Sequence, residues 1–85
     1  MPAITMYTTK VCPYCIAAKR LLNKKGAAFE EVDVSFDAAK REELIKLAGG
    51  RMTVPQIFIG DYHVGGCDEL YELEASGKLD TLLNG

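Results

Sequence analysis

The stretch AITMYTTKVCPYCIAAKRLLNKKG, residues 3–26, decides the fold, because it passes from a strand pattern to a helix pattern through two cysteines. Residues 3–7 alternate apolar and β-prone side chains, which predicts a short strand. Pro13 favours the first turn of a helix, where its missing N–H would have no partner anyway. The apolar side of this predicted helix consists of Ile16, Ala17, Ala18, Leu21 and Leu22. Gly26 is a suitable end for the helix, so Cys12 and Cys15 are predicted at its beginning.

The rest of the chain changes between the same two periodicities. Residues 28–34 predict a second strand, and Asp37 is predicted to cap the helix that follows it. The buried side of that helix is expected to consist of Leu44, Ile45, Leu47 and Ala48. Residues 56–59 and 62–64 predict two further strands, and the short turn between them makes the pair antiparallel.

These elements predict an α/β fold with the order β-α-β-α-β-β-α-α. A helix closed by Gly77 follows the fourth strand, and a last short helix is predicted from Leu79, Leu82 and Leu83. The first two strands flank a helix and should therefore be parallel, with a right-handed crossover. The expected architecture is a mixed four-stranded sheet with helices on both faces, in a single domain over residues 1–85.

The composition excludes several classes of function. The formal net charge of −2 is unfavourable for a general nucleic-acid-binding protein. The sequence has neither a transmembrane-length apolar run nor an export signal, so we expect no membrane association. Three cysteines without such a signal indicate a reducing compartment rather than a disulfide framework. We therefore expect a cytoplasmic monomer.

The part of the chain that holds Cys12 and Cys15 is cationic. No acidic residue precedes Glu30, whereas the basic residues before it are Lys10, Lys19, Arg20, Lys24 and Lys25. A solvated helix face explains the basic residues between 19 and 25. Lys10 lies two residues before Cys12 and is a candidate for function.

Cys12 has the features of a nucleophile. The attacking species in disulfide exchange is the thiolate, and an ordinary cysteine is mostly protonated at neutral pH. At the start of a helix, the free N–H groups of Tyr14 and Cys15 can point at the Cys12 sulfur, and the helix dipole favours its charged form. We therefore predict that Cys12 ionises more readily than an ordinary cysteine and attacks substrate disulfides.

Cys15 is the complementary thiol of this pair. It lies one helical turn after Cys12, on the inner side, where it can reach the Cys12 sulfur and resolve a mixed disulfide. Tyr14 has no clear role in the core, so its ring is expected to form one wall of the substrate groove. A Cys-x-x-Cys between a strand and a helix predicts a thiol–disulfide oxidoreductase.

A zinc site is the competing interpretation of the cysteines. Cys12, Cys15, His63 and Cys67 form a possible ligand set of three cysteines and one histidine. Pro13 and the helix dipole favour one exposed thiolate instead of a closed ligand shell, and the alternation of residues 62–64 can place His63 in solvent. We therefore expect no metal and treat His63 as a bystander.

Three segments in this order resemble the signature segments of the dithiol glutaredoxins, and the small bacterial members above all. They are TKVCPYC at residues 9–15, TVPQIFI at 53–59 and GGCDEL at 65–70. The resemblance extends over essentially the whole chain. It implies a thioredoxin-like fold and an enzyme that reduces protein disulfides and protein–glutathione mixed disulfides. Glutathione would be its co-substrate, and no bound cofactor is needed.

The resemblance also implies a set of residues that bind glutathione. Val54, before a cis-Pro55, would pair its backbone with the cysteinyl part, and Lys10 and the region from Arg51 to Thr53 would lie near the glycyl carboxylate. The segment of Gly66, Cys67 and Asp68 would receive the γ-glutamyl end, with Asp68 on its ammonium. Asp68 as a helix N-cap is the competing role, and both roles can coexist. We expect Gln56 to be an exposed strand position.

Alternatives remain open for the role of Cys67 and for the functional class of the protein. Cys67 is interpreted as a small buried residue, although a helix terminus that lowers its pKa would make it a third redox site. The first rival to a glutaredoxin is a thioredoxin-type reductase, which the Pro-Tyr pair and the charges of Asp68 and Lys10 disfavour. The second is a metal or iron–sulfur binding module, which Pro13 and the second cysteine disfavour.

Overall fold

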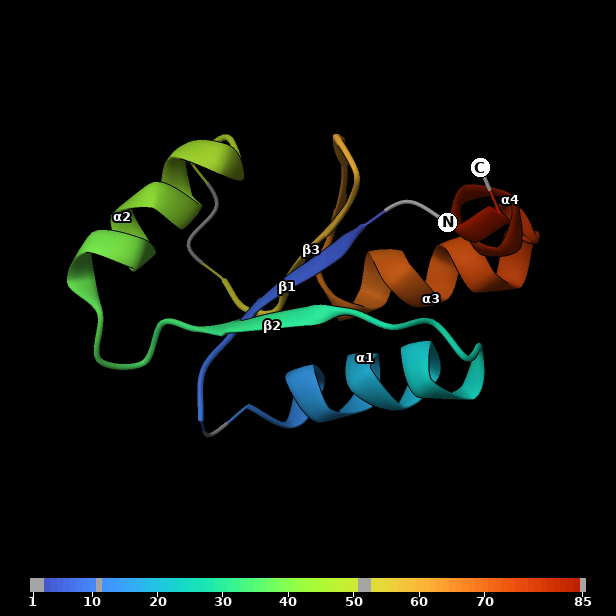
Figure 1. Cartoon of the computed structure of the whole chain (residues 1–85), viewed down its shortest axis with the longest axis horizontal. Helices are drawn as coiled ribbons and strands as arrows, with labels where there is room; N and C mark the ends of the chain where they lie inside the picture. The colour runs from blue at the N-terminus through green and yellow to red at the C-terminus, as the bar shows by residue number, and fades with distance from the viewer. Residues whose placement is uncertain (1–2, 11, 51–52, 85) are drawn as a thin grey trace.

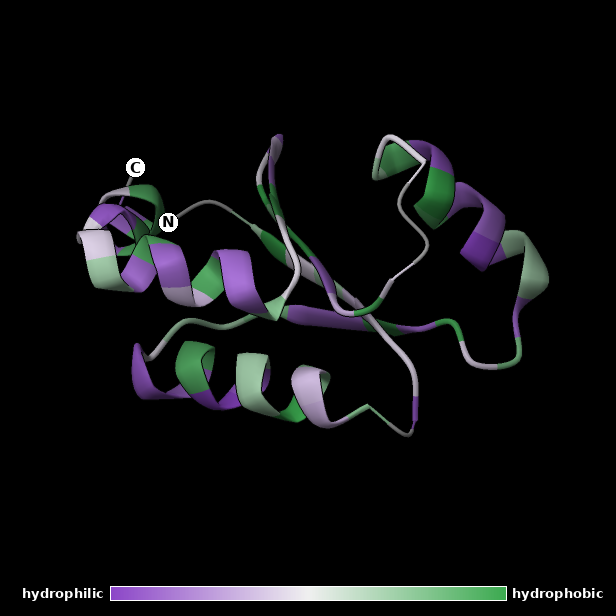
Figure 2. Cartoon of the chain, turned by 180° about the vertical axis from the view of Figure 1, so that it is seen from behind, coloured by the Kyte–Doolittle hydropathy of each residue, from purple (hydrophilic) through white to green (hydrophobic). Residues whose placement is uncertain are grey.

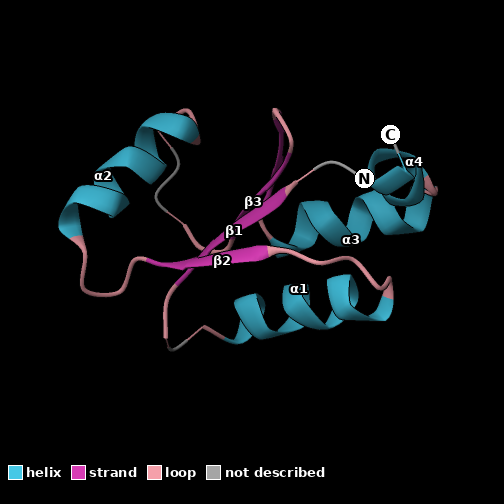
Figure 3. Ribbon diagram, viewed as in Figure 1, coloured by secondary structure: helices cyan, strands magenta, loops and turns pink. Residues whose placement is uncertain are grey.

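A mixed β-sheet lies between the helices of the chain (Figure 3). The computed structural model describes residues 3–10, 12–50 and 53–84. The elements are β1 (Ile4–Thr8), α1 (Pro13–Lys24), β2 (Glu30–Asp33), α2 (Ala38–Leu47), β3 (Gln56–Ile59), β4 (Tyr62–Gly65), α3 (Cys67–Ser76) and α4 (Lys78–Asn84). This is the predicted order. Within the described ranges, every helix is too short or too polar to traverse a lipid bilayer.

The sheet has the strand order β2-β1-β3-β4. β1 and β2 are parallel, whereas β3 runs antiparallel to both β1 and β4. The crossover through α1 and the tight β3–β4 hairpin confirm the predicted connections. β2 is an edge strand, and it exposes three acidic side chains, Glu30, Glu31 and Asp33.

The helices cover the two faces of the sheet unequally. Figure 1 shows α1 and α3 on one side of the sheet and α2 on the other. Ile4 and Met6 of β1 point into the core beneath α1 and α3, whereas Thr5 and Tyr7 point to the side that carries α2. The buried residues of the main core are Ile4, Met6, Ala18, Leu21, Leu22, Ala27, Ile57, Ile59, Val64, Cys67, Leu70, Leu79 and Leu83.

Two apolar side chains predicted in the core lie on the surface instead. Ile16 is 53% exposed, because α1 turns Cys15 and Ala18 inward. Leu47 is 51% exposed, since α2 buries Leu44 and leaves Leu47 on its flank. Figure 2 shows both helices with hydrophobic and hydrophilic segments in alternation, which is why hydropathy alone did not fix which side faces the sheet.

The strand boundaries differ slightly from the prediction. β1 extends to Thr8, because Thr8 still pairs with Asp33 of β2, and β2 is shorter than the predicted 28–34. The cap at Asp37 is confirmed: its carboxylate accepts a hydrogen bond from the Lys40 N–H at 3.0 Å.

The beginning of α3 corrects one interpretation. Gly66, and not Asp68, is the N-cap of α3, so Asp68 is the second residue of the helix. Gly77 ends this helix in the left-handed conformation, with a φ of 79°, as its position predicted.

Candidate active site

Cys12 lies directly before α1, and its sulfur caps the helix. The Cys12 backbone is extended, with φ −149° and ψ 100°, which turns its side chain back over the first helical turn. The N–H of Cys15 donates a hydrogen bond to Cys12 Sγ at 3.3 Å. An N–H directed at the sulfur stabilises the thiolate, and the positive end of the helix dipole acts in the same direction.

Cys12 is 8% exposed, so its side chain is not the exposed group that the sequence predicted, and Cys15, one turn further, is only 1% exposed. Burial, followed by the hydrogen bond and the negative charge of Cys12, raises the pKa of Cys15 from an ordinary value of 9.0 to about 12. A backbone hydrogen bond from Thr9 and the charge of Lys19 oppose this change only in part. Cys15 is therefore a thiol at neutral pH.

The reduced protein is expected to lose stability in alkaline solution. The folded chain holds the Cys15 proton more tightly than the unfolded chain does, so this contribution is complete below pH 9.0 and is lost as the pH rises toward about 12. From one group, the free energy of unfolding falls by at most about 1.4 kcal/mol per pH unit. Urea unfolding of reduced protein across this range measures the slope. The slope should be shallower for Cys15→Ser, and equal slopes would contradict the assignment.

The segment 53–55 lies beside the Cys12 sulfur. The Cys12 thiol donates to the Val54 carbonyl oxygen at an Sγ–O distance of 3.7 Å. The Val54–Pro55 peptide bond is cis, as the resemblance to the glutaredoxins implied. Pro55 is buried, Val54 is half-buried and Thr53 is exposed, so the segment is anchored at one end and open at the other.

A groove of about 590 Å³ runs along this segment. Its lining residues are Tyr14, Thr53, Val54, Pro55, Gly66, Cys67, Asp68 and Glu69. Three chain segments that are far apart in the sequence thus meet here, which is what the three signature segments predicted. Tyr14 is 64% exposed and forms one wall, in agreement with its predicted position.

Among the predicted binding residues that the structure describes, Lys10 does not line the groove. The Lys10 ammonium stands over the Phe36 ring, 5.2 Å from its centroid, and the Lys10 N–H donates to Ser35 Oγ at 2.7 Å. Lys10 is therefore turned toward the loop that follows β2. Arg51 lies outside the described residues.

Cys67 is the first residue of α3 and is 8% exposed. Burial, followed by the negative charges of Asp68, Cys12 and Glu69, raises the pKa of Cys67 above its ordinary value. This is the reverse of the lowered pKa that a helix terminus would produce on its own. The finding favours the interpretation of Cys67 as a small buried residue in the wall of the groove.

Two residues of this region were missed or misjudged from the sequence. Glu69 lines the groove, and its carboxylate accepts from the Gly66 N–H at 3.2 Å. Its position three residues after the N-cap is the available signal. Gln56 was expected to be exposed but is completely buried, because the strand face that carries it is covered. Nothing in the alternation of β3 shows which of its faces is covered.

His63 does not lie in solvent as expected. It is half-buried, its ring stacks on Phe58 at 4.7 Å between centroids, and its Nε2 lies 2.7 Å from Gln56 Oε1. Within the residues that the structure describes, no group of three or more His, Cys, Asp or Glu side chains is placed to hold a metal ion.

Comparison with known proteins identifies this arrangement. The glutaredoxin family pattern matches residues 4–64. Glutaredoxin 3 of Escherichia coli strain K12 is 55% identical over 83 residues, which covers 98% of this chain and 99% of the relative. The solution structure of glutaredoxin from Brucella melitensis is 54% identical with a TM-score of 0.86, covering 98% of this chain and 89% of that one.

A structure with a named ligand is also similar. The buckwheat glutaredoxin–glutathione complex superposes with a TM-score of 0.88 at 30% identity, covering 98% of this chain and 77% of that chain. The thioredoxin-like fold and the resemblance drawn from the three segments are thereby confirmed. With its two thiols adjacent at the start of α1, this chain belongs to the glutaredoxin family and is a glutathione-dependent thiol–disulfide oxidoreductase.

Proposed function

We propose that this chain removes glutathione from protein–glutathione mixed disulfides and reduces protein disulfides, with Cys12 as the nucleophile and Cys15 as the resolving thiol. The observation that carries the proposal is the Cys12 sulfur, which accepts the Cys15 N–H at 3.3 Å at the start of α1. Cysteine-containing proteins are the proposed substrates. A monomer in a reducing cytoplasm is the proposed setting, which is consistent with three free thiols in the chain.

Glutathione is proposed to occupy the groove along the segment 53–55. Its cysteinyl backbone would pair with Val54, which brings its sulfur toward Cys12, since the Val54 carbonyl lies 3.7 Å from Cys12 Sγ. Its γ-glutamyl carboxylate would meet the N–H groups at the start of α3, and its ammonium would meet Asp68 in the first turn. Tyr14, Gly66 and Cys67 supply the remaining wall.

The glycyl carboxylate of glutathione is proposed to draw on Lys10 and the region from Arg51 to Thr53. Lys10 is exposed, and the contact of its ammonium with Phe36 is worth only about 0.5–1 kcal/mol at an exposed site. A carboxylate in the groove can compete for this ammonium at little cost.

In the first reaction, the Cys12 thiolate attacks the glutathione sulfur of a protein–glutathione disulfide. A bond forms between the two sulfurs, the original disulfide breaks, and the protein thiolate leaves and takes up a proton. A glutathione thiolate then attacks the same glutathione sulfur, which gives oxidised glutathione and restores the Cys12 thiolate. This sequence needs one enzyme thiol.

In the second reaction, the Cys12 thiolate attacks one sulfur of a protein disulfide and releases the other. Cys15 gives up its proton and attacks the Cys12 sulfur, which releases the reduced protein and leaves a disulfide between Cys12 and Cys15. Two glutathione molecules then restore the dithiol and become oxidised glutathione.

Reduction of the oxidised enzyme tests this function against a thioredoxin-type activity. We expect glutathione to restore the dithiol and a thioredoxin reductase with NADPH to restore little of it. The measurement is the free-thiol content of the enzyme after incubation with each reductant. Reduction by the reductase alone would contradict the proposal.

Asp68→Asn is expected to weaken glutathione recognition without removing the chemistry. The change keeps the shape of the side chain and removes the charge proposed to meet the ammonium, so KM for a glutathionylated peptide should rise about tenfold while kcat stays within about twofold. Steady-state kinetics measure both constants. Asp61→Asn is the matched control, because Asp61 is an exposed carboxylate in the β3–β4 turn, outside the groove. Equal effects of the two variants would contradict the role of Asp68.

A further inference from the structure

Gln56 is a fully buried polar side chain that the proposed reactions do not use. Its Nε2 donates to the Thr53 carbonyl oxygen at 2.9 Å and lies 3.1 Å from Thr53 Oγ1. Its Oε1 lies 2.7 Å from His63 Nε2. A short chain of hydrogen bonds therefore runs from His63 on β4, through Gln56 on β3, to Thr53 in the wall of the active-site groove.

The donors and acceptors in this chain are fixed by chemistry. The Thr53 carbonyl oxygen can only accept, so the NH₂ group of Gln56 must face Thr53 and its amide oxygen must face His63. His63 must then donate through Nε2–H. Gln56 is the fully buried member, so loss of the His63 donor leaves the buried Gln56 amide oxygen without this hydrogen bond, which is costly.

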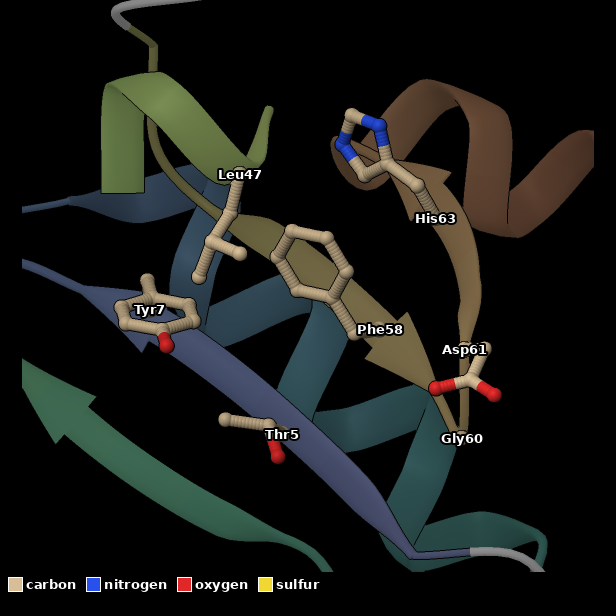
Figure 4. Close-up of a pocket in the computed structure, with 7 residues that line it drawn as sticks. All are labelled: Thr5, Tyr7, Leu47, Phe58, Gly60, Asp61 and His63. Atoms are coloured by element: carbon tan, nitrogen blue, oxygen red, sulfur yellow. The ribbon is translucent and has the colours of Figure 1, made fainter. Parts of the chain in front are cut away.

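His63 is itself held by packing on the sheet face that carries α2. Its ring stacks on Phe58 with an interplanar angle of 17°, and Phe58 meets the Tyr7 ring edge-on at 5.8 Å. Figure 4 shows His63, Phe58 and Tyr7 together on this face, beside Leu47 of α2. The Phe58 ring thus packs against one face of the His63 imidazole, and Gln56 holds its edge by a hydrogen bond.

We propose that Gln56 and His63 are positioning residues for the segment 53–55, and that they set the geometry of the glutathione site from the opposite face of the sheet. The inference rests on the function proposed above. Thr53 is exposed and Val54 is half-buried, so side-chain packing holds this end of the segment only weakly. The Val54 carbonyl nevertheless lies 3.7 Å from Cys12 Sγ, where a small displacement changes how a bound sulfur approaches.

Gln56→Met tests the first half of the chain of hydrogen bonds. Methionine has a similar volume and no hydrogen-bonding group that can replace the amide, so KM for a glutathionylated peptide should rise about tenfold, with kcat within about twofold of the wild type. The split between the two constants separates positioning from a structural role, because partial unfolding lowers the amount of active enzyme and therefore the apparent kcat. Circular dichroism gives the folded fraction.

His63 supplies a pair of variants that does not depend on how Gln56→Met folds. His63→Phe keeps a ring on Phe58 but has no donor, and KM should rise about threefold to tenfold. His63→Gln returns an amide N–H near the position of Nε2 and should restore most of the wild-type KM. Thr5→Val is the matched control, because it removes a hydroxyl from the same face, in the same pocket, outside the chain of hydrogen bonds.

Raised KM in Gln56→Met and His63→Phe, with rescue by His63→Gln and an unchanged Thr5→Val, would support the inference. Wild-type KM in His63→Phe, or equal KM values for His63→Phe and His63→Gln, would overturn it. Failure of the proposed function is a different result, since the wild-type enzyme itself would then release no glutathione from the peptide.

Discussion

Cys12→Ser is expected to abolish both the release of glutathione from mixed disulfides and the reduction of protein disulfides. A serine hydroxyl is not ionised at neutral pH and cannot form a disulfide, so both rates should fall by at least about 10⁴-fold, to the uncatalysed background. The buried Cys15 cannot replace Cys12, because its pKa of about 12 keeps it protonated and it is 1% exposed.

Release of a labelled glutathione group from a peptide, with glutathione as reductant, measures the first activity, and reduction of a protein disulfide measures the second. Iodoacetamide labelling at neutral pH is an independent readout, since the wild type should react quickly at one thiol and Cys12→Ser should not. Circular dichroism of the variant controls for folding. Residual turnover well above background in a folded Cys12→Ser protein would contradict the assignment of the nucleophile.

Cys15→Ser is expected to separate the two activities. Release of glutathione needs only Cys12 and should stay within about threefold of the wild type, whereas reduction of a protein disulfide should fall by about 10²-fold or more, because the mixed disulfide on Cys12 is no longer resolved from within. The burial that raises the pKa of Cys15 explains why its thiol acts late, after Cys12 has been captured by substrate.

The separation is measured by assaying both substrates on one preparation. A covalent adduct between Cys15→Ser and the protein substrate should accumulate and be visible by mass spectrometry under non-reducing conditions. Cys15→Ala is the companion variant, since it lacks both the thiol and the serine hydroxyl but keeps the backbone N–H that donates to Cys12 Sγ. Loss of both activities in both variants would contradict the one-thiol route.

The order of the elements and the two thiols could be predicted because their signals are local. Strand alternation, Pro13 at the start of a helix and Gly77 at the end of another each depend on a few neighbouring residues. The position of Asp68 in the groove followed from a resemblance between three segments rather than from any local rule. That is why its competing role as an N-cap was not excluded until Gly66 was seen in that place.

The errors share a different physical cause. Ile16, Leu47 and Gln56 were misjudged because their exposure depends on which face of each element meets the sheet, and hydropathy does not determine this for short elements. Hydropathy is equally silent about side-chain hydrogen bonds, as the Gln56–His63 contact between β3 and β4 shows. The contact of the Lys10 ammonium with the exposed ring of Phe36 likewise had no signal in the sequence pattern.

The acidic outer strand has a consequence for how copies of this chain meet. β2 ends the sheet with its backbone unpaired on one side, and such a border invites a strand from another molecule. Two copies paired through β2 would bring Glu30 and Asp33 close to the same carboxylates of the other copy, and like charges placed close together repel, whereas Glu31 is already paired with Lys19. The acidic side chains of β2 are therefore expected to oppose pairing of two copies through this edge.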